Sequence, residues 1–355
     1  MSDGPDAQSA ERNTPARRRS RWRDPRVLLG LFITVVAIWF AFRDVDVRAV
    51  LGQFRRANLV VLLGLSIPAY LLMVYLRALR WRHLIDPTQS VPTGALFRAV
   101  AVGFMANNVF PLRMGEFVRS WYLGRETGVS PTAIFGTVIL ERVVDTLVVI
   151  LLALAVLLIW GGGDDGAWRR GLLLLVPVAL APIAGLTWLR RDAERVLGLV
   201  SVALRPLPAR LRGAVVGQLR TFSGGLGALR GGVHLFWIAF HSLLIWLVAS
   251  SIPISAGILA LGVDLGTPAR MLAASWTTLA AVGIAVALPS APGFFGVYHS
   301  ACRLALERFG IPAEVALALG TLVHAVFWFT LTGLGFGVLR SRVTSLAEVD
   351  EIASR

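Results

Sequence analysis

Charged residues and helix breakers occur together inside a long apolar part of the chain. The stretch Asn107–Arg119 reads NNVFPLRMGEFVR. A helix that begins at Pro111, where a missing N–H is harmless, puts Glu116 three residues from both Arg113 and Arg119. Guanidinium groups suit phosphate because their planar fork donates two hydrogen bonds at once, and a helix start adds free N–H groups and a positive dipole end. The segment is therefore a candidate phosphate-binding site.

A second charged cluster follows in the apolar run Ala133–Trp160. Its motif ERVVD places Glu141 and Asp145 four residues apart, with Arg142 within reach of Asp145. In a helix that enters the membrane near Pro131, the cluster lies about 15–20 Å deep. Each charge there costs about 2.5–3.5 kcal/mol on insertion scales, so these side chains face the protein interior or a water-filled cavity.

Two interpretations of the charges stay open. Three Arg and three carboxylates form either a neutral buried network that pins the helices together, or a site where Arg exchanges a carboxylate for a substrate phosphate. The candidate substrate-binding residues are Asn107, Arg113, Glu116, Arg119, Glu141, Arg142 and Asp145.

The composition indicates that these charges lie in a membrane. Of the 355 residues, 56% are hydrophobic and only 16% are charged, whereas soluble proteins are about 25% charged. Seven apolar runs are near or above the length of about 20 residues that a spanning helix needs. They are Val27–Phe42, Leu59–Leu76, Ala133–Trp160, Gly171–Leu189, Leu235–Leu261, Met271–Leu288 and Ala316–Leu339. The fold class is an all-α polytopic integral membrane protein.

The net charge of +14 reflects membrane topology rather than nucleic-acid binding. All 35 basic residues are Arg, which excludes a Lys nucleophile, a Schiff base and a P-loop Lys. Most of them lie in short connections beside apolar spans, as the positive-inside rule expects. The five His show no metal-ligand spacing, and we expect neither a metal nor a cofactor. The single cysteine, Cys302, allows no intrachain disulfide.

The distribution of Arg also predicts orientation and boundaries. Residues 1–26 form an Arg-rich, disordered cytoplasmic tail, residues 27–340 a transmembrane domain and residues 341–355 a short cytoplasmic tail. The second span then delivers Arg77, Arg80 and Arg82 to the cytoplasm. We expect a cytoplasmic (inner) membrane protein of a bacterium or archaeon, with both termini cytoplasmic.

This topology predicts two re-entrant helical hairpins. Thr93–Thr127 begins and ends on the cytoplasmic side, while Thr267–Pro312 begins and ends outside. Such an inverted repeat with broken helices is typical of transporters. It gives about six spanning helices plus two hairpins, about eight hydrophobic helices in all. Alternatively, Met271–Leu288 spans fully and Ser300–Gly310 is a short return helix. The predicted hairpin breaks contain Pro111, Gly115, Pro289, Pro292, Gly293 and Gly296.

The motifs resemble the flippase-like transmembrane domain of lysylphosphatidylglycerol synthases and its stand-alone relatives. The resemblance rests on N-x-x-x-P-x-R-x-G-E-x-x-R from Asn107 to Arg119, on Gly128–Ser130 and on the E-R-x-x-D of Glu141–Asp145. At the second break, relatives often read P-G-G-x-G, whereas residues 292–296 here read PGFFG and His299 stands near a commonly acidic position.

The resemblance implies a module that moves a lipid between leaflets through an Arg/Glu-lined midplane cavity. The lipid that the resemblance implies is phosphate-bearing, aminoacylated or polyprenyl-linked, such as an aminoacylated phosphatidylglycerol. Synthase relatives add a soluble aminoacyl-transferase domain, and the residues after Arg340 are too few for one. We therefore expect a translocator whose partners are membrane lipids, not an enzyme and not a nucleic-acid binder.

Two alternatives stay open. One is a membrane-embedded lipid-phosphate transferase or hydrolase with Glu116 or Asp145 as general base, although the sequence shows no nucleophile–base pair. The other is a non-catalytic membrane subunit of a separate lipid-modifying enzyme.

Overall fold

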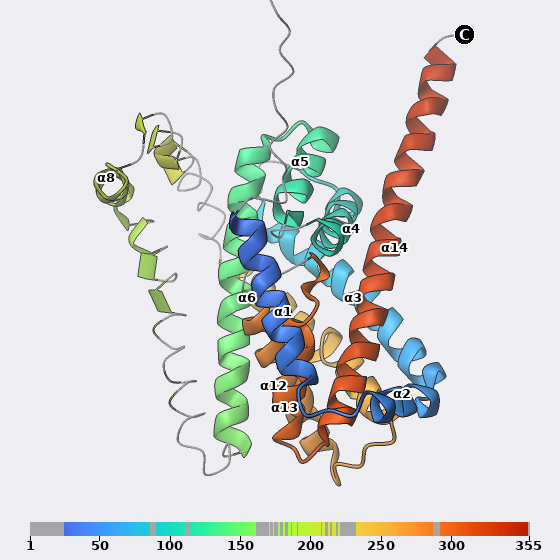
Figure 1. The fold of residues 1–355 in the computed structure, drawn as a ribbon. Coiled ribbons are helices and arrows are strands. Elements are labelled where there is room, and N and C mark those ends of the chain that lie inside the picture. The colour runs from blue at the N-terminus through green and yellow to red at the C-terminus, as the bar shows by residue number, and fades with distance from the viewer. Residues whose placement is uncertain are drawn as a thin grey trace, which may run out of the picture.

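The structure is helical throughout its described part. It is a computed structural model that describes residues 25–85, 90–110, 114–160, 191–206, 232–286 and 292–353, with scattered positions between 170 and 220. Within these ranges there is no strand (Figure 1). Three helices in this part are long and apolar enough to cross a membrane: Leu59–Leu84, Gly232–Ala260 and Ala313–Ser341. The all-α class is confirmed.

In the described part of the first half, the structure contains six helices. They are α1 (Pro25–Phe42), α2 (Val47–Arg56), α3 (Leu59–Leu84), α4 (Thr93–Val109), α5 (Gly115–Thr127) and α6 (Pro131–Trp160). Local chemistry sets their ends: Asn58 Oδ1 accepts a hydrogen bond from Val61 N at the start of α3, and Gly128 ends α5 in the left-handed conformation. At 1.5 Å per residue, α6 is about 45 Å long.

The described part of the second half includes two interrupted helical regions. Its bounded elements are α8 (Ala193–Ala203), α10 (Gly232–Leu243), η4 (Leu244–Ala249), α11 (Ile252–Ala260), α12 (Pro268–Ala285), η5 (Pro292–Phe294), α13 (Val297–Glu307) and α14 (Ala313–Ala353). The predicted span Leu235–Leu261 is thus interrupted by a π-helical turn, η4. The predicted span Gly171–Leu189 lies largely outside the described residues. The last helix, α14, continues past the expected boundary at Arg340.

The two pairs of short helices lie toward opposite ends of the molecule. In Figure 1, α4 and α5 lie near the end at which α1 begins and α14 ends, while α12 and α13 lie nearer the other end. The turn η5 contacts α4, so the second break meets the first helix pair inside the bundle.

The breaks differ in detail from the sequence prediction. Gly293 and Gly296 adopt positive φ angles of 70° and 82°, so both mark a backbone break that favours glycine. Pro292 begins η5. In the first pair, α5 begins at Gly115, with Met114 preceding it in a turn, and the predicted helix start at Pro111 is not tested. Pro111 and Pro289 lie outside the described residues.

Gly115 permits a close contact between α4 and α5. A Cβ at this position collides with the carbonyl oxygen of Gly103 and lies 2.5 Å from the side chain of Asn107. Asn107 Oδ1 instead accepts a hydrogen bond of 2.7 Å from the backbone N of Gly115. Small residues let membrane helices approach closely, and the Asn side chain satisfies one of the free N–H groups of α5. Asn107 and Gly115, both selected from the sequence, thus hold α4 and α5 against each other.

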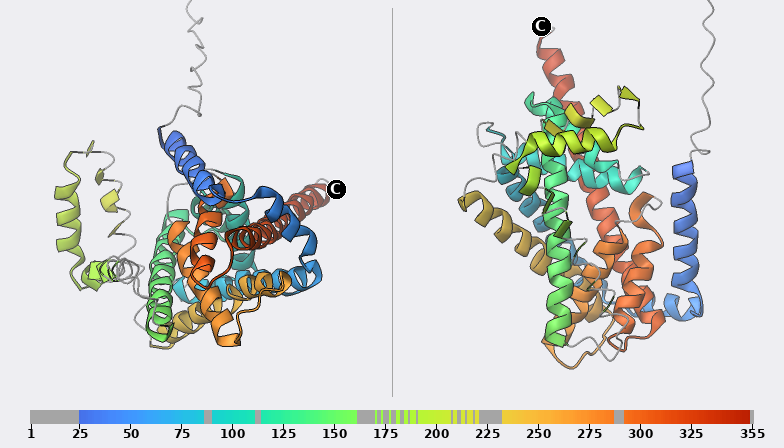
Figure 2. Two further views of the ribbon diagram at one scale, coloured as in Figure 1. Left: turned by 60° about the horizontal axis from the view of Figure 1, so that its bottom comes forward. Right: turned by 90° about the vertical axis from the view of Figure 1, so that its left-hand side faces the viewer.

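The second break is attached to α1, which lies on the outside of the bundle (Figure 2). Ser300 Oγ donates to the carbonyl oxygen of Ala37 at 2.6 Å. Arg303 Nη1 donates to the carbonyl oxygens of Phe40, Ala41 and Arg43 at 3.3, 3.0 and 2.8 Å. The last carbonyls of a helix have no partner within it, so Arg303 supplies the cap that the end of α1 lacks.

Large apolar side chains face outward from the bundle. Phe32 and Val35 on α1 are 65% and 64% exposed, and Phe329 on α14 is 70% exposed. The spanning helices bury only about half of their most apolar windows inside the protein. A soluble protein rarely exposes so much contiguous apolar surface. The protein is therefore a multi-pass membrane protein.

Candidate functional site

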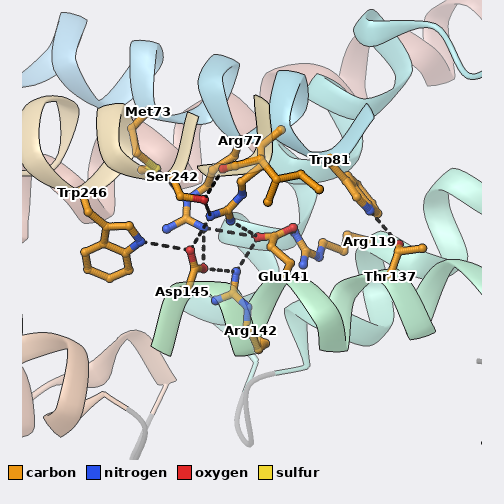
Figure 3. A network of polar contacts seen from close by, with 12 residues as sticks. Met73, Arg77, Trp81, Arg119, Thr137, Glu141, Arg142, Asp145, Ser242 and Trp246 are labelled. Atoms are coloured by element: carbon orange, nitrogen blue, oxygen red, sulfur yellow. Dashed lines mark hydrogen bonds and ion pairs between the residues drawn. The ribbon is translucent and has the colours of Figure 1, made fainter. Parts of the chain in front are cut away.

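A cluster of buried charges lies where α3, α5, α6 and η4 approach one another (Figure 3). Its two carboxylates, Glu141 and Asp145, lie one turn apart on α6 and point into the bundle. Four guanidinium groups surround them, from Arg77 and Arg80 on α3, Arg119 on α5 and Arg142 on α6. We call these six residues the charge cluster.

Each oxygen of Asp145 faces two nitrogen donors. Oδ1 accepts hydrogen bonds from Arg80 Nη1 at 2.7 Å and from Trp246 Nε1 at 3.0 Å. Oδ2 accepts one from Arg77 Nη1 at 2.9 Å and lies 3.0 Å from Arg142 Nη2. A carboxylate has about four lone-pair sites, so all the acceptor capacity of Asp145 is used.

Glu141 is completely buried and contacts all four Arg side chains. Its Oε1 lies 2.6 Å from Arg142, 3.2 Å from Arg80 and 3.3 Å from Arg77, and its Oε2 lies 3.1 Å from Arg119. Its side chain has no exposed surface. Removing one partner of a buried ion pair leaves an uncompensated charge, so this carboxylate holds three helices together electrostatically.

Aromatic rings and a hydroxyl hold the guanidinium groups in place. Arg119 lies over the ring of Trp81 at 4.8 Å, and Arg77 lies 5.9 Å from the ring of Trp246. Ser242 Oγ accepts a hydrogen bond from Arg80 at 3.1 Å. Such cation–π contacts strengthen in desolvated surroundings. The π turn η4 carries Trp246 toward Asp145, and π turns frequently occur at functional sites.

A cavity of about 680 Å³ borders the charge cluster. Its polar wall contains Arg77, Asn107, Glu116, Arg142 and Asp145, and its other lining residues are mostly aromatic or aliphatic. Arg142 is the most open member of the cluster, because 37% of its side chain is exposed whereas Arg80 is fully buried. Arg80, Arg119 and Glu141 form the side of the cluster away from the cavity.

Both halves of the chain contribute to this cavity. Asn107 and Glu116 come from the α4–α5 pair, while Phe294 and Tyr298 come from the second break and α13. Asn108, beside the first break, donates to Thr332 Oγ1 on α14 at 2.9 Å, which fixes the end of α4.

The structure brings together most of the residues that the sequence selected. Arg119, Glu141, Arg142 and Asp145 form direct ion pairs, and the predicted contact of Arg142 with Asp145 is present at 3.0 Å. Glu116 lies on the cavity wall. Arg113 lies outside the described residues. A role in substrate binding stays a prediction for all seven residues selected from the sequence.

The sequence did not select Arg77 and Arg80 as site residues, and the structure buries both inside the bundle; the side of the membrane on which they lie stays a prediction. They are 6% and 0% exposed, and both form ion pairs with Glu141 and Asp145. Their spacing of three residues on an apolar helix is the available signal, because it puts both on one face. They also change the charge balance. In the described part of the chain, the cluster together with Glu116 has one more Arg than carboxylates.

The amino-acid sequence that builds this site also matches the model of a known protein family. A family model described as "Lysylphosphatidylglycerol synthase TM region" matches residues 27–335. The chain belongs to this family. Its transmembrane-region match includes every helix that surrounds the charge cluster.

A curated protein is also similar to this chain. Glycosyltransferase AglD of Haloferax volcanii is 25% identical over 328 residues, which cover 84% of this chain and 52% of the relative. The chain thus spans about half the length of the curated relative that it matches. No solved structure matches this member of the synthase transmembrane-region family.

Proposed function

We propose that this protein moves a lipid between the leaflets of its membrane, with the headgroup in the cavity beside the charge cluster and the tails in the surrounding lipid. One observation carries the proposal: a cavity of about 680 Å³ has Arg77 and Arg142 on its polar wall and mostly apolar side chains elsewhere. A lipid has the same division between a charged headgroup and apolar tails.

We infer that α4–α5 and α12–α13 are re-entrant hairpins of an inverted repeat. By length, α4 and α5 measure about 25 and 20 Å, and α12 and α13 about 27 and 17 Å. Each is shorter than a hydrocarbon core of about 30 Å. In this arrangement, roughly six spanning helices surround the two pairs. The broken helices then enter from opposite sides of the membrane and meet beside one cavity, as in many transporters. Both termini then lie on the cytoplasmic side of a bacterial or archaeal inner membrane.

A second candidate is a non-catalytic membrane subunit or module that serves a lipid-modifying enzyme. The observation that favours it is the relative named as a glycosyltransferase, of which this chain spans about half. In that case the charge cluster only holds α3, α5 and α6 together. A transferase or hydrolase that uses Asp145 as general base is less well supported, because both oxygens of Asp145 already face two donors each.

The test is a lipid-flipping assay with purified protein in liposomes. Fluorescent phospholipids are placed in both leaflets, and a membrane-impermeant quencher reports how fast inner-leaflet lipid becomes accessible. We expect the protein to accelerate exposure, Arg142→Gln to abolish the acceleration, and Arg195→Gln, an exposed control on α8, to retain it. Exposure at the rate of protein-free liposomes refutes the translocator and favours the second candidate.

A further inference from the structure

The two carboxylates of the charge cluster are already paired with guanidinium groups, and Glu116 is the carboxylate of the cavity wall that lies outside the cluster. Both oxygens of Asp145 face two donors within 3.0 Å, and Glu141 is fully buried among four guanidinium groups. An ammonium group needs acceptor oxygens, because it has three donors and no acceptor. To bind one here, Asp145 must first give up an Arg partner.

Hydrogen-bond donors, by contrast, are in excess. Among the described residues, Arg119 Nε, Arg119 Nη2 and Arg142 Nε are buried and have no hydrogen-bond partner. Arg119 is 5% exposed. A buried donor without a partner costs free energy, and one attached to a charged group costs more. A ligand rich in acceptor oxygens supplies what these nitrogens lack.

The charge balance points the same way. Four Arg side chains are paired with Glu141 and Asp145, and even with Glu116 of the cavity wall counted, the described residues carry one excess positive charge. A phosphate monoester or diester removes that excess, whereas a headgroup with extra ammonium groups increases it. At the low effective dielectric constant of a buried site, this difference is large.

Arg142 is the residue best placed to receive the anion. It lines the cavity, and 37% of its side chain is exposed, compared with 7% for Arg77 and 6% for Arg119. Its Nη2 contacts Glu141 and Asp145, while its Nε is unpaired. A phosphate in the cavity supplies the acceptor that this side chain lacks, and the buried Nε must turn toward the cavity to reach it.

We propose, resting on the translocator function above, that the cavity selects a lipid headgroup that carries a phosphate and no cationic substituent, and that Arg142 binds this phosphate. Phosphatidylglycerol and phosphatidic acid fit this class. Lysylphosphatidylglycerol, the lipid in the family's description, does not fit. Its headgroup carries the same phosphate, but the lysyl ester on the glycerol adds two ammonium groups.

The experiment compares lipids that share their tails and differ only in headgroup. Wild-type protein in liposomes is assayed with labelled phosphatidic acid, phosphatidylglycerol, phosphatidylcholine and lysylphosphatidylglycerol. We expect the two anionic lipids to cross at least tenfold faster than the other two. Equal rates for all four lipids, or faster movement of the lysylated lipid, overturn the proposed selectivity.

A binding measurement separates this inference from the translocator function. The same lipids are added to the protein in detergent, and its unfolding temperature is recorded, since a ligand that binds only the folded state stabilises it. If no lipid crosses but the anionic lipids alone raise the unfolding temperature, the headgroup selectivity stands and transport is refuted. If the lysylated lipid raises it as much, the selectivity is refuted.

Arg142 and the source of the phosphate are tested by two further arms. Arg142→Gln is expected to lose the stabilisation by phosphatidic acid, while Arg195→Gln retains it; an undiminished shift in Arg142→Gln refutes the assignment of this residue. Liposomes are also tested for uptake of radioactive inorganic phosphate. No uptake supports a lipid headgroup, and saturable uptake overturns it in favour of free phosphate.

Discussion

Glu141→Gln tests whether the charge cluster holds the helices together. The substitution keeps the size of a side chain with no exposed surface but removes the negative charge that faces four guanidinium groups at 2.6–3.3 Å. Asp145 then remains as the carboxylate partner of Arg77, Arg80 and Arg142 in the cluster, while Arg119 loses its ion pair. Breaking a buried ion pair typically costs about 3–5 kcal/mol, and we expect a loss of that size in the free energy of unfolding.

The matched control is Glu194→Gln on α8. Glu194 also forms an ion pair, at 2.8 Å from Arg220, but the two side chains are 76% and 63% exposed. Exposed pairs contribute about 0–1 kcal/mol because water screens them and holding them costs side-chain entropy. Glu194→Gln makes the same chemical change in an exposed ion pair, so we expect almost no change in the free energy of unfolding.

The assay is reversible unfolding in mixed detergent micelles, followed by helical circular dichroism. Adding Arg80→Gln to Glu141→Gln is expected to recover part of the loss, since it removes one of the buried positive charges left without a partner. A loss in Glu141→Gln within about 1 kcal/mol of the Glu194→Gln control refutes the role assigned to the buried network.

Three further predictions concern the site, the second break and the topology. Arg119→Lys keeps the charge beside Glu141 but loses the planar fork and the stacking geometry, so we expect lipid flipping to fall at least tenfold while the unfolding temperature changes little. Gly310→Ala and Gly296→Ala both place a Cβ at positive φ, which costs about 1–2 kcal/mol. At Gly296 the Cβ also lies 2.8 Å from a backbone oxygen of α1, so we expect the larger loss of unfolding free energy there. Equal losses in the two variants contradict the contact between Gly296 and α1. Single cysteines at Ser130 and Ala269 are expected to react with an impermeant reagent from the cytoplasmic and the external side respectively, and labelling of both from one side rules out the inverted repeat.

The helical class and much of the site could be predicted because hydrocarbon imposes simple rules. Apolar runs of about 20 residues have few alternatives to spanning helices. Glu141, Arg142 and Asp145 inside such a run must find partners, and the structure supplies them. The partners on α3 could not be predicted in the same way. The positive-inside rule counts Arg near the end of a span as cytoplasmic, and only packing against α6 distinguishes Arg80, which is buried, from Arg82, which is exposed.

The first break shows the limit of local rules. Pro favours the first turn of a helix, but Pro111 lies outside the described residues, and the described helix α5 begins at Gly115. The side chain of Asn107, which reaches back from the preceding helix to the N–H of Gly115, sets that start. Such a contact depends on how α4 and α5 pack, so neither propensity nor charge pattern reveals it.

The cap that Arg303 provides for α1 has a consequence for the order of assembly. The carbonyl oxygen of Arg43 and its donor are 260 residues apart in the chain. During synthesis, α1 emerges from the ribosome long before α13, and water must satisfy its last carbonyls in the interval. This early helix of the described chain can therefore complete its contacts only after α13 has been made. A nascent chain that stops before α13 leaves α1 without its anchor and exposes it to membrane quality-control proteases.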